Sequence, residues 1–471
     1  MRPLKISLLL FFLALLFLPR MWAQSTAPPA GTPSVDSDPP IDPTVSGSSI
    51  TEAPTGFNDT PNGTDPNFIT FAVHHNIDLP QFDKVDLIAD GLGPTYNAQS
   101  CRECHQNPVS GAISQVTELR AGHLDGNGNF VPATVTINGG TDTIANRSLI
   151  NDRAICPAKL HDNNGNVTFN FPTTNDQEHV PDTETVTALR SSLNLLGDGF
   201  VEAVNSNTLA QISNNQPAGM QGQLVSVPVF EAPGKLRVGR FGWKDQEATL
   251  LSFSGDAYVN EIGVTNRLFP TDFTTLCDTV SDPEDTPSPT PDPITGTHLA
   301  DIDRFARFMR ATNAPSRGPG AETSSNPDPD IVAGSQIFEQ ISCSVCHVRS
   351  IVTVPPGTVI NGGQFTVPPQ LGNKRFHPFG DFLLHNIGTG DEIVQTTLPG
   401  TNTLDQSTAE KMRTAPLWGL RTHDRFLHDQ RALTLTQAIL DHAGEAQGSA
   451  NSFRNLTDTQ KDQLLKFLNS L

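Results

Sequence analysis

Apolar residues recur at helical spacing in several stretches of the chain. In the segment 299–310, four apolar side chains follow one another at intervals of three, one and three residues, which places them on one face of a helix. A second amphipathic helix is predicted over 458–468, where Thr457 and Gln460 form a capping box. The spacing also indicates helices from Thr185 to Leu196 and over 434–443. These segments predict a mainly α fold.

The helical pattern is interrupted between residues 111 and 175 by a pattern typical of strands and turns. Short β-prone pieces such as 131–137 alternate there with turns rich in Gly and Asn, such as 125–128. We therefore expect an insertion with short β-hairpins, mounted on an otherwise helical domain. This insertion is where substrate or partner specificity is expected, although its residues do not say for what.

Composition shifts predict the domain limits. Arg2 and Lys5 precede the apolar run 6–18, and Ala23 offers a cleavage point, which indicates an export signal. No later stretch is apolar enough to cross a bilayer, so no transmembrane segment is expected after signal removal, and the periplasm or secretion is the expected destination. The predicted units are a signal peptide (1–23), a disordered leader (24–66), an N-terminal domain (67–313) with the insertion at about 111–175, a linker (314–330) and a C-terminal domain (331–471).

Acidic residues outnumber basic ones, giving a formal net charge of −20. A strongly acidic surface repels nucleic acid, so nucleic-acid binding is excluded, and a protein partner docked by electrostatics is expected to present a basic face. The acidity is equally explained as a solubility device of an exported protein.

Two short runs, Cys101–His105 and Cys343–His347, share the spacing C-x-x-C-H. Two thiols at this spacing can each form a thioether with a haem vinyl group, and the adjacent His then becomes the proximal iron ligand. Zinc would need a further thiol pair, but Cys156 and Cys277 stand alone. The sequence therefore predicts two covalently bound c-type haems, on Cys101, Cys104 and His105 and on Cys343, Cys346 and His347, in two cytochrome c-like domains. Cys156 and Cys277 are free to pair in an exported protein, but sequence gives no distance between them.

Longer motifs surround these runs. Gly91–Pro94 and Asn97–His105, then Gly239–Lys244, and finally Phe426–Asp429 and His442–Ala446 resemble the bacterial di-haem oxidoreductase family of peroxidases, also labelled thiol oxidoreductase. The resemblance covers most of 82–471 and extends to the di-haem cytochrome c peroxidases. It implies that hydrogen peroxide reacts at the N-terminal haem. Electrons would enter at the C-terminal haem from a small donor protein, a cytochrome c or a cupredoxin.

The resemblance also implies roles for individual residues. Glu261, in the run Glu261–Gly263, matches the catalytic acid/base, and a buried carboxyl group has the raised pKa that such a role needs. Trp243 lies near the tryptophan that relays electrons between the haems, although a packing role is equally open. The relatives carry a Gln before the Glu where this chain has Ser252 and Phe253, and a phenyl ring cannot hydrogen-bond peroxide.

Axial ligands follow from the same resemblance. His442 is favoured as the sixth ligand of the C-terminal haem, with Met412 as the rival; a bis-His haem has a lower potential than a His/Met haem. His123 resembles a mobile ligand of the N-terminal haem, while a lone His in a Gly/Asn-rich loop is also typical of a solvated surface. A Ca²⁺ between the haems is a further expectation, since Thr414–Pro416 matches part of its site; the Asn of that site falls near Asn194 or Gly197, where the match is incomplete.

Three functions remain open from sequence. The first is a peroxidase that reduces hydrogen peroxide, and the second is a di-haem electron carrier without catalysis. The third is an oxidase of a thiol or protein side chain. Glu261 favours catalysis, whereas Phe253 weakens the match to the known peroxidases.

Overall fold

The computed structural model describes residues 49–57, 77–137, 142–161, 167–175, 177–274, 276–278, 280–293 and 295–471. The predicted signal peptide and most of the predicted leader lie outside these residues. Residues 49–57 of the leader are described, and within them β1 (Thr51–Glu52) pairs in parallel with β16 (Lys374–Phe376). Strand β16 also pairs with β13 (Ile351–Val352), so the earliest described residues are joined to the C-terminal third of the chain.

The inserted region forms the largest sheet among the described residues. Its strand order is β10–β3–β4–β5, with β6 also paired with β3, and all pairs are antiparallel. Alternate residues of β4, Ala133, Val135 and Ile137, are fully buried, because successive side chains of a strand point to opposite faces. The strands are β3 (Thr117–Leu124), β4 (Phe130–Ile137), β5 (Asp142–Arg147), β6 (Leu149–Ile150) and β10 (Val186–Ser191).

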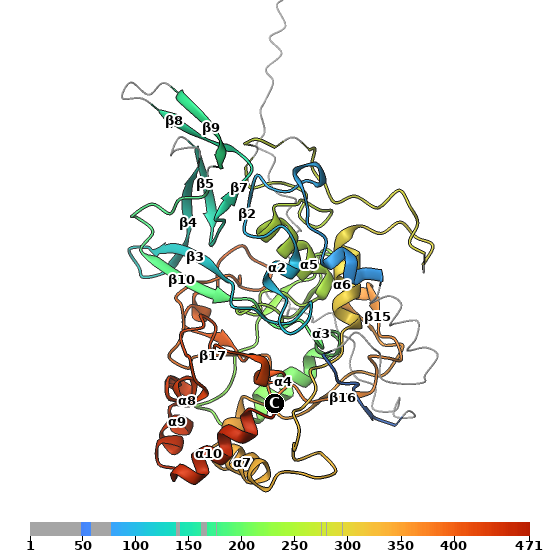
Figure 1. Cartoon of the computed structure of the whole chain (residues 1–471), viewed down its shortest axis with the longest axis vertical. Helices are drawn as coiled ribbons and strands as arrows, with labels where there is room; N and C mark the ends of the chain where they lie inside the picture. Colours follow the sequence, from blue (N-terminus) through green and yellow to red (C-terminus); the bar gives the residue numbers. More distant parts are fainter. Residues whose placement is uncertain are drawn as a thin grey trace, which may run out of the picture.

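Two smaller two-stranded sheets accompany this sheet. Strand β2 (Thr95–Tyr96) pairs with β7 (Arg153–Ala154), which joins the loop before the first C-x-x-C-H run to the insertion. Strands β8 (Pro157–His161) and β9 (Val167–Asn175) project at one end of the molecule, opposite the end where the last helices gather (Figure 1).

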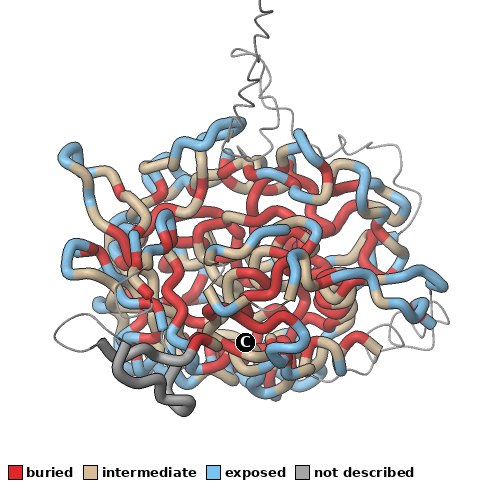
Figure 2. The backbone as a smooth tube through the Cα atoms, turned by 90° about the horizontal axis from the view of Figure 1, so that it is seen from above, coloured by how far each residue is buried: buried red, intermediate tan, exposed pale blue. Residues whose placement is uncertain are grey.

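The central part of the molecule consists of short helices and irregular loops around the main core. Phe200, Val201, Leu250 and Phe305 are among its fully buried residues, and Figure 2 shows buried chain throughout the middle of the molecule. The elements are η1 (Ile88–Asp90), α2 (Cys101–Cys104), α3 (Asp198–Glu202), α4 (Ser206–Asn215), β11 (Ser226–Pro228), β12 (Leu236–Val238), α5 (Leu250–Ala257), the π-helical turn η2 (Tyr258–Ile262) and α6 (Asp301–Ala311).

The C-terminal part has a second core, in which α7 (Pro329–Gln340) packs against α10 (Asp458–Leu468). Gly334 permits this close contact, since a Cβ there would lie 2.0 Å from the Gln463 carbonyl oxygen. The remaining elements are η3 (Cys343–Val345), β14 (Val359–Ile360), η4 (Asn361–Gly363), β15 (Phe365–Thr366), β17 (Leu384–His385), η5 (Gln406–Thr408), β18 (Met412–Arg413), η6 (Leu420–Thr422), α8 (Leu435–Leu440), η7 (Gly444–Ala446) and α9 (Gln447–Arg454).

The prediction of a mainly α fold was wrong. Strands are spread along the whole described chain, and the fold is mixed. The segment Thr185–Leu196 shows why: it was predicted as a helix, but its first half is β10, paired with β3 over six residues. A short run of β-prone residues can fit both the helical and the strand periodicity. Here the pairing with β3 makes the segment a strand.

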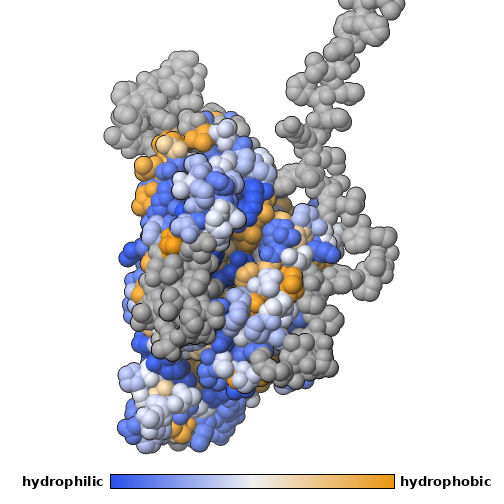
Figure 3. All heavy atoms as spheres, turned by 90° about the vertical axis from the view of Figure 1, so that its right-hand side faces the viewer, coloured by the Kyte–Doolittle hydropathy of each residue, from blue (hydrophilic) through white to orange (hydrophobic). Residues whose placement is uncertain are grey.

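The surface is consistent with the acidic composition. The face in Figure 3 is mainly hydrophilic, with small, separate hydrophobic patches. Among the described residues, no helix has the length and apolar character needed to span a membrane.

Candidate functional site

The first C-x-x-C-H run opens onto a cavity of about 570 Å³, which we call the first cavity. Cys101, Cys104 and His105 all line it. Helix α2 is a single turn that ends where the His105 amide donates to the Cys101 carbonyl (3.1 Å), so His105 follows the two thiols directly at the cavity. Burial lowers the pKa of His105 to about 4, so the ring is neutral and offers a lone pair to a metal.

The second run opens onto a separate cavity of about 230 Å³, the second cavity, lined by Cys343, Cys346 and His347. His347 Nδ1 donates to the Phe379 carbonyl at 3.0 Å, which leaves its Nε2 as the nitrogen with a free lone pair.

The second cavity is also lined by both residues considered for its sixth ligand. His442 Nδ1 donates to the Ala438 carbonyl at 2.7 Å, so its Nε2 is free in the same way as that of His347. Met412, on β18, is buried and lines the cavity too. The structure therefore places both rivals at the second cavity, and the free Nε2 of His442 makes it the better-prepared ligand.

Glu261 lines the first cavity from the π-helical turn η2. The Asn97 side-chain amide donates to Glu261 Oε2 at 2.9 Å, and the backbone amides of Asn97 and Ala98 donate to the Glu261 carbonyl at 2.7 and 3.1 Å. The loop that leads into the first C-x-x-C-H run is thus bonded to this glutamate. Burial, followed by the charge of Glu118, raises the pKa of Glu261 well above the ordinary value.

Trp243 lines both cavities. Its indole Nε1 donates to the Ser191 carbonyl at 2.8 Å, and its carbonyl accepts from the Arg413 amide at 2.8 Å. The indole ring also lies edge-on to His428, with ring centroids 6.0 Å apart. Trp243 therefore lies between the two cavities, with both its side chain and its backbone held by hydrogen bonds.

The structure does not bring His123 to the site. It lies on β3 with 37% of its side chain exposed, its Nδ1 is 2.7 Å from Glu184 Oε2, and it lines neither cavity.

Residues of the calcium expectation do come together. Asn194 and the run Thr414–Pro416 all line the second cavity, and Asn194 Oδ1 accepts from the Leu196 amide at 3.3 Å.

Sequence reasoning missed the charged side chains that the inserted sheet contributes to the first cavity. Glu118, Arg120, Arg147 and Arg190 line it from three strands. The alternation of Glu118 and Arg120 on one face of a strand was the available signal. Which part of the molecule these charged side chains face depends on how the strands pair, and the sequence pattern does not specify that pairing.

The cavity residues fit a porphyrin. The first cavity combines apolar walls, including Phe82 and Phe253, with buried guanidinium donors that have no partner, Nε and Nη1 of Arg147 and Nη2 of Arg190. Both guanidinium groups have a carboxylate partner, Glu178 for Arg147 and Asp391 for Arg190, but these remaining N–H donors are available to an anionic group. A porphyrin carries two carboxylates on an apolar ring.

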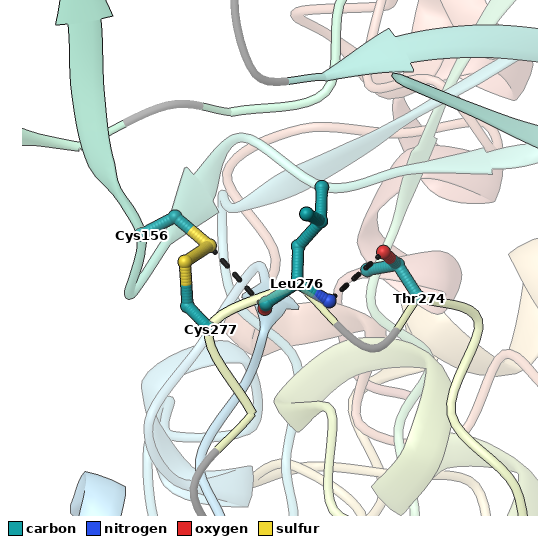
Figure 4. Close-up of a disulfide and its surroundings, with 4 residues drawn as sticks. All are labelled: Cys156, Thr274, Leu276 and Cys277. Atoms are coloured by element: carbon teal, nitrogen blue, oxygen red, sulfur yellow. Dashed lines mark hydrogen bonds between the residues drawn. A yellow bond between two sulfur atoms is a disulfide. The ribbon is translucent and has the colours of Figure 1, made fainter. Parts of the chain in front are cut away.

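The disulfide question left open by the sequence is answered: Cys156 and Cys277 are bonded (Figure 4). The Leu276 carbonyl lies 3.3 Å from Cys156 Sγ. This bond fixes the loop carrying Phe273, another residue of the first cavity, to the insertion. Arg147 lies over the Phe273 ring at 3.8 Å, so the loop and the inserted sheet meet at the cavity wall.

The chain is similar to known proteins over part of its length. The model of a family described as "Di-haem oxidoreductase, putative peroxidase" matches residues 172–471. Among solved structures, hydrazine synthase of Kuenenia stuttgartiensis is similar at 17% identity and a TM-score of 0.24, covering 38% of this chain and 56% of that chain. A MauG-like protein associated with microbial copper homeostasis is similar at 17% identity and a TM-score of 0.22, covering 36% and 52%. The chain spans about half the length of these two proteins. No curated protein matches it.

Proposed function

Because the chain belongs to the di-haem oxidoreductase family, we propose that it reduces hydrogen peroxide in the first cavity, with electrons arriving through the second. The haems would be attached to the two C-x-x-C-H runs, after export of the chain. A haem bound in each cavity supplies redox-active iron, which exchanges electrons one at a time. The electrons come from a small donor protein, a cytochrome c or a cupredoxin.

One observation carries this proposal: the two cavities differ in their ligands. Of the histidines that line the second cavity, His347 and His442 each donate Nδ1 to a backbone carbonyl and keep Nε2 free, which suits a six-coordinate site that only carries electrons. Among the described residues that line the first cavity, His105 is the one histidine, and Glu261 supplies an acid there. A site with an open position beside a proton donor is suited to peroxide.

Glu261 acts as the acid in this proposal. Reduction of hydrogen peroxide breaks the O–O bond, and the departing oxygen needs a proton to leave as water. Burial raises the pKa of the Glu261 carboxyl, which favours its protonated form, and the Asn97 amide holds it in place. Trp243, which lines both cavities, offers a π system for electron passage between them.

The test is turnover of hydrogen peroxide by the haem-loaded protein with a reduced donor, together with absorption and EPR spectra of each haem. Glu261→Gln is expected to lower kcat about 10²- to 10⁴-fold with unchanged haem content, because the amide cannot give the proton. Glu392→Gln changes an exposed glutamate outside both cavities and serves as the control. Equal rates in the two variants would contradict the role of Glu261.

An electron carrier without catalysis is the second candidate, and Met309 is the observation that favours it. Met309 also lines the first cavity, from helix α6, and a thioether sulfur is a haem ligand. If Met309 closes that site, the first haem is six-coordinate and inert to peroxide. Met309→Leu then converts its spectrum to that of an open haem, whereas under our proposal the spectrum does not change.

A further inference from the structure

Two carboxyl groups from distant parts of the chain meet in the first cavity. Glu118, on β3 of the inserted sheet, and Glu261, on η2, are hydrogen-bonded through their side chains. Arg120 Nε donates to Glu118 Oε1 at 2.6 Å, and the Asn97 amide donates to Glu261 Oε2 at 2.9 Å. Two ionised carboxylates repel each other and have no hydrogen to share, so this contact holds one proton.

The groups around the pair determine which glutamate carries that proton. Burial, followed by the charge of Glu118, raises the pKa of Glu261. Burial also opposes ionisation of Glu118, but the Arg120 guanidinium and the bond with Glu261 outweigh it and lower its pKa. The proton therefore lies on Glu261, and Glu118 accepts it as the carboxylate. The other charged or titratable groups that face the pair are Cys104 and the following His105 at α2, Arg147 on β5, Arg190 on β10 and Asp256 on α5.

We propose that Glu118 and Glu261 work as one acid/base pair, in which Glu118 of the inserted sheet receives and returns the proton that Glu261 exchanges with peroxide. This inference rests on the proposed function and assigns the inserted sheet a part in it. Glu118 touches Glu261, so it is a positioning residue for the proton.

The overall step is balanced. Hydrogen peroxide takes up two electrons from the reduced donor protein and two protons, its O–O bond breaks, and two waters form. Glu261 gives one proton to the departing oxygen and becomes ionised, and the second proton comes from solvent. Two adjacent carboxylates are then unstable, so Glu118 receives a further proton from solvent and returns it to Glu261. A lone buried glutamate lacks this drive for reprotonation.

The test compares Glu118→Gln with Glu184→Gln in the haem-loaded protein. Glu184 lies at the edge of the same sheet and outside both cavities, and its bond to the Thr134 amide at 3.1 Å survives the change. Removing the Glu118 charge lowers the pKa of Glu261, so the alkaline limb of the pH–rate profile is expected to move to lower pH. The rate is expected to fall about 10- to 100-fold. Arg120→Gln removes the cation that lowers both pKa values, so it is expected to move the limb to higher pH.

Infrared difference spectroscopy gives a readout that does not depend on turnover. A protonated carboxyl band at neutral pH is expected in the wild type and in Glu184→Gln, absent in Glu261→Gln, and shifted in Glu118→Gln. If the wild type reduces peroxide and Glu261→Gln abolishes this, while Glu118→Gln matches Glu184→Gln in profile and spectrum, the pair is refuted and the proposed function stands. If peroxide is not reduced at all, the proposed function fails, and the infrared bands alone decide whether the pair exists. If Glu118→Gln does not fold, the opposite shift of Arg120→Gln decides.

Discussion

In the second cavity, His347 and His442 each donate Nδ1 to a backbone carbonyl, so that Nε2 is the nitrogen available to bind a metal in both. His347 follows the haem-attachment run directly, whereas His442 arrives from the end of α8, almost a hundred residues later. This shared preparation distinguishes His442 from Met412, which lines the same cavity from β18.

His442→Met is therefore expected to change the ligation of the second haem and to raise its reduction potential, because a His/Met haem has a higher potential than a bis-His haem. The shift is a part of the roughly 0.8 V range that axial ligands control. Potentiometric titration with EPR measures both effects. Met412→Leu is the matched variant, and if that change instead raises or abolishes the low-potential signal, Met412 is the ligand.

At this scale, sequence is informative where spacing is local. Cys101, Cys104 and His105 are close neighbours in the chain, so a haem-attachment site is predicted there without a fold, and the structure places all three on the first cavity. Glu118 was missed because its meeting with Glu261 spans more than 140 residues and depends on how β3 is placed. His123 lies on the same strand as Glu118, and it faces Glu184 and solvent rather than the cavity.

Among the elements, the π-helical turn η2 has the largest consequence for the site. It follows α5 without a break and ends at Gly263, whose φ of 81° favours glycine. A Cβ at this position would lie 2.7 Å from the Thr95 carbonyl oxygen and 2.8 Å from Gly93 Cα. Because position 263 has no side chain, the loop before the first C-x-x-C-H run packs directly against the turn that carries Glu261.

Gly263→Ala is expected to lower the free energy of unfolding by about 1–3 kcal/mol and to reduce peroxide turnover, because both the backbone strain and the clash displace Glu261. Denaturant titration and steady-state kinetics measure the two effects. Gly128→Ala provides the comparison, since its φ of 80° is similar but no atom lies within 4 Å of the added carbon. If both variants behave alike, strain alone explains the loss and the contact with Thr95 plays no part.

Elements were predictable where their own residues determine them. Helix α10 begins and ends where the sequence analysis placed it, because the Thr457 capping box fixes its start. Helix α6 lies within one or two residues of the predicted range, owing to its clear apolar face. Strand β10 was predicted as a helix, since only its partner β3 shows that Val186–Ser191 is extended.

The molecule as a whole is held together across the inserted region. The disulfide joins Cys156, after β7, to Cys277, 121 residues further along the chain. Val186 of β10 and Phe130 of β4 pack with Ile393 and Val394 of the C-terminal part, so the inserted sheet touches both halves of the protein.

Replacing both Cys156 and Cys277 by Ser is expected to lower the free energy of unfolding by about 4–5 kcal/mol, because a closed loop of this length strongly restricts the unfolded chain. Urea titration with and without reductant measures this. The first haem's spectrum is expected to change as well, since the disulfide anchors the loop with Phe273, whereas the second haem's spectrum is not. An equal change at both haems would contradict a local anchoring role.

The proposed function requires electron transfer between the two cavities, which depends on the whole molecule. Trp243 lines both cavities and is the side chain we propose for this transfer. Trp243→Phe keeps an aromatic ring but removes the Nε1 donor to Ser191, which fixes the indole between the cavities. We expect both haems to remain bound and the transfer of an electron from the second to the first to slow by about tenfold, equivalent to ~1.4 kcal/mol in the barrier. Stopped-flow spectra after mixing the donor-reduced protein with peroxide give this rate.

Trp418→Phe alters a buried tryptophan that lines neither cavity and controls for a general loss of packing. If the two variants transfer electrons at the same rate, the route between the cavities does not pass through Trp243, and the hydrogen-bonded backbone of Ser191 and Leu193, which also line both cavities, is the next to test.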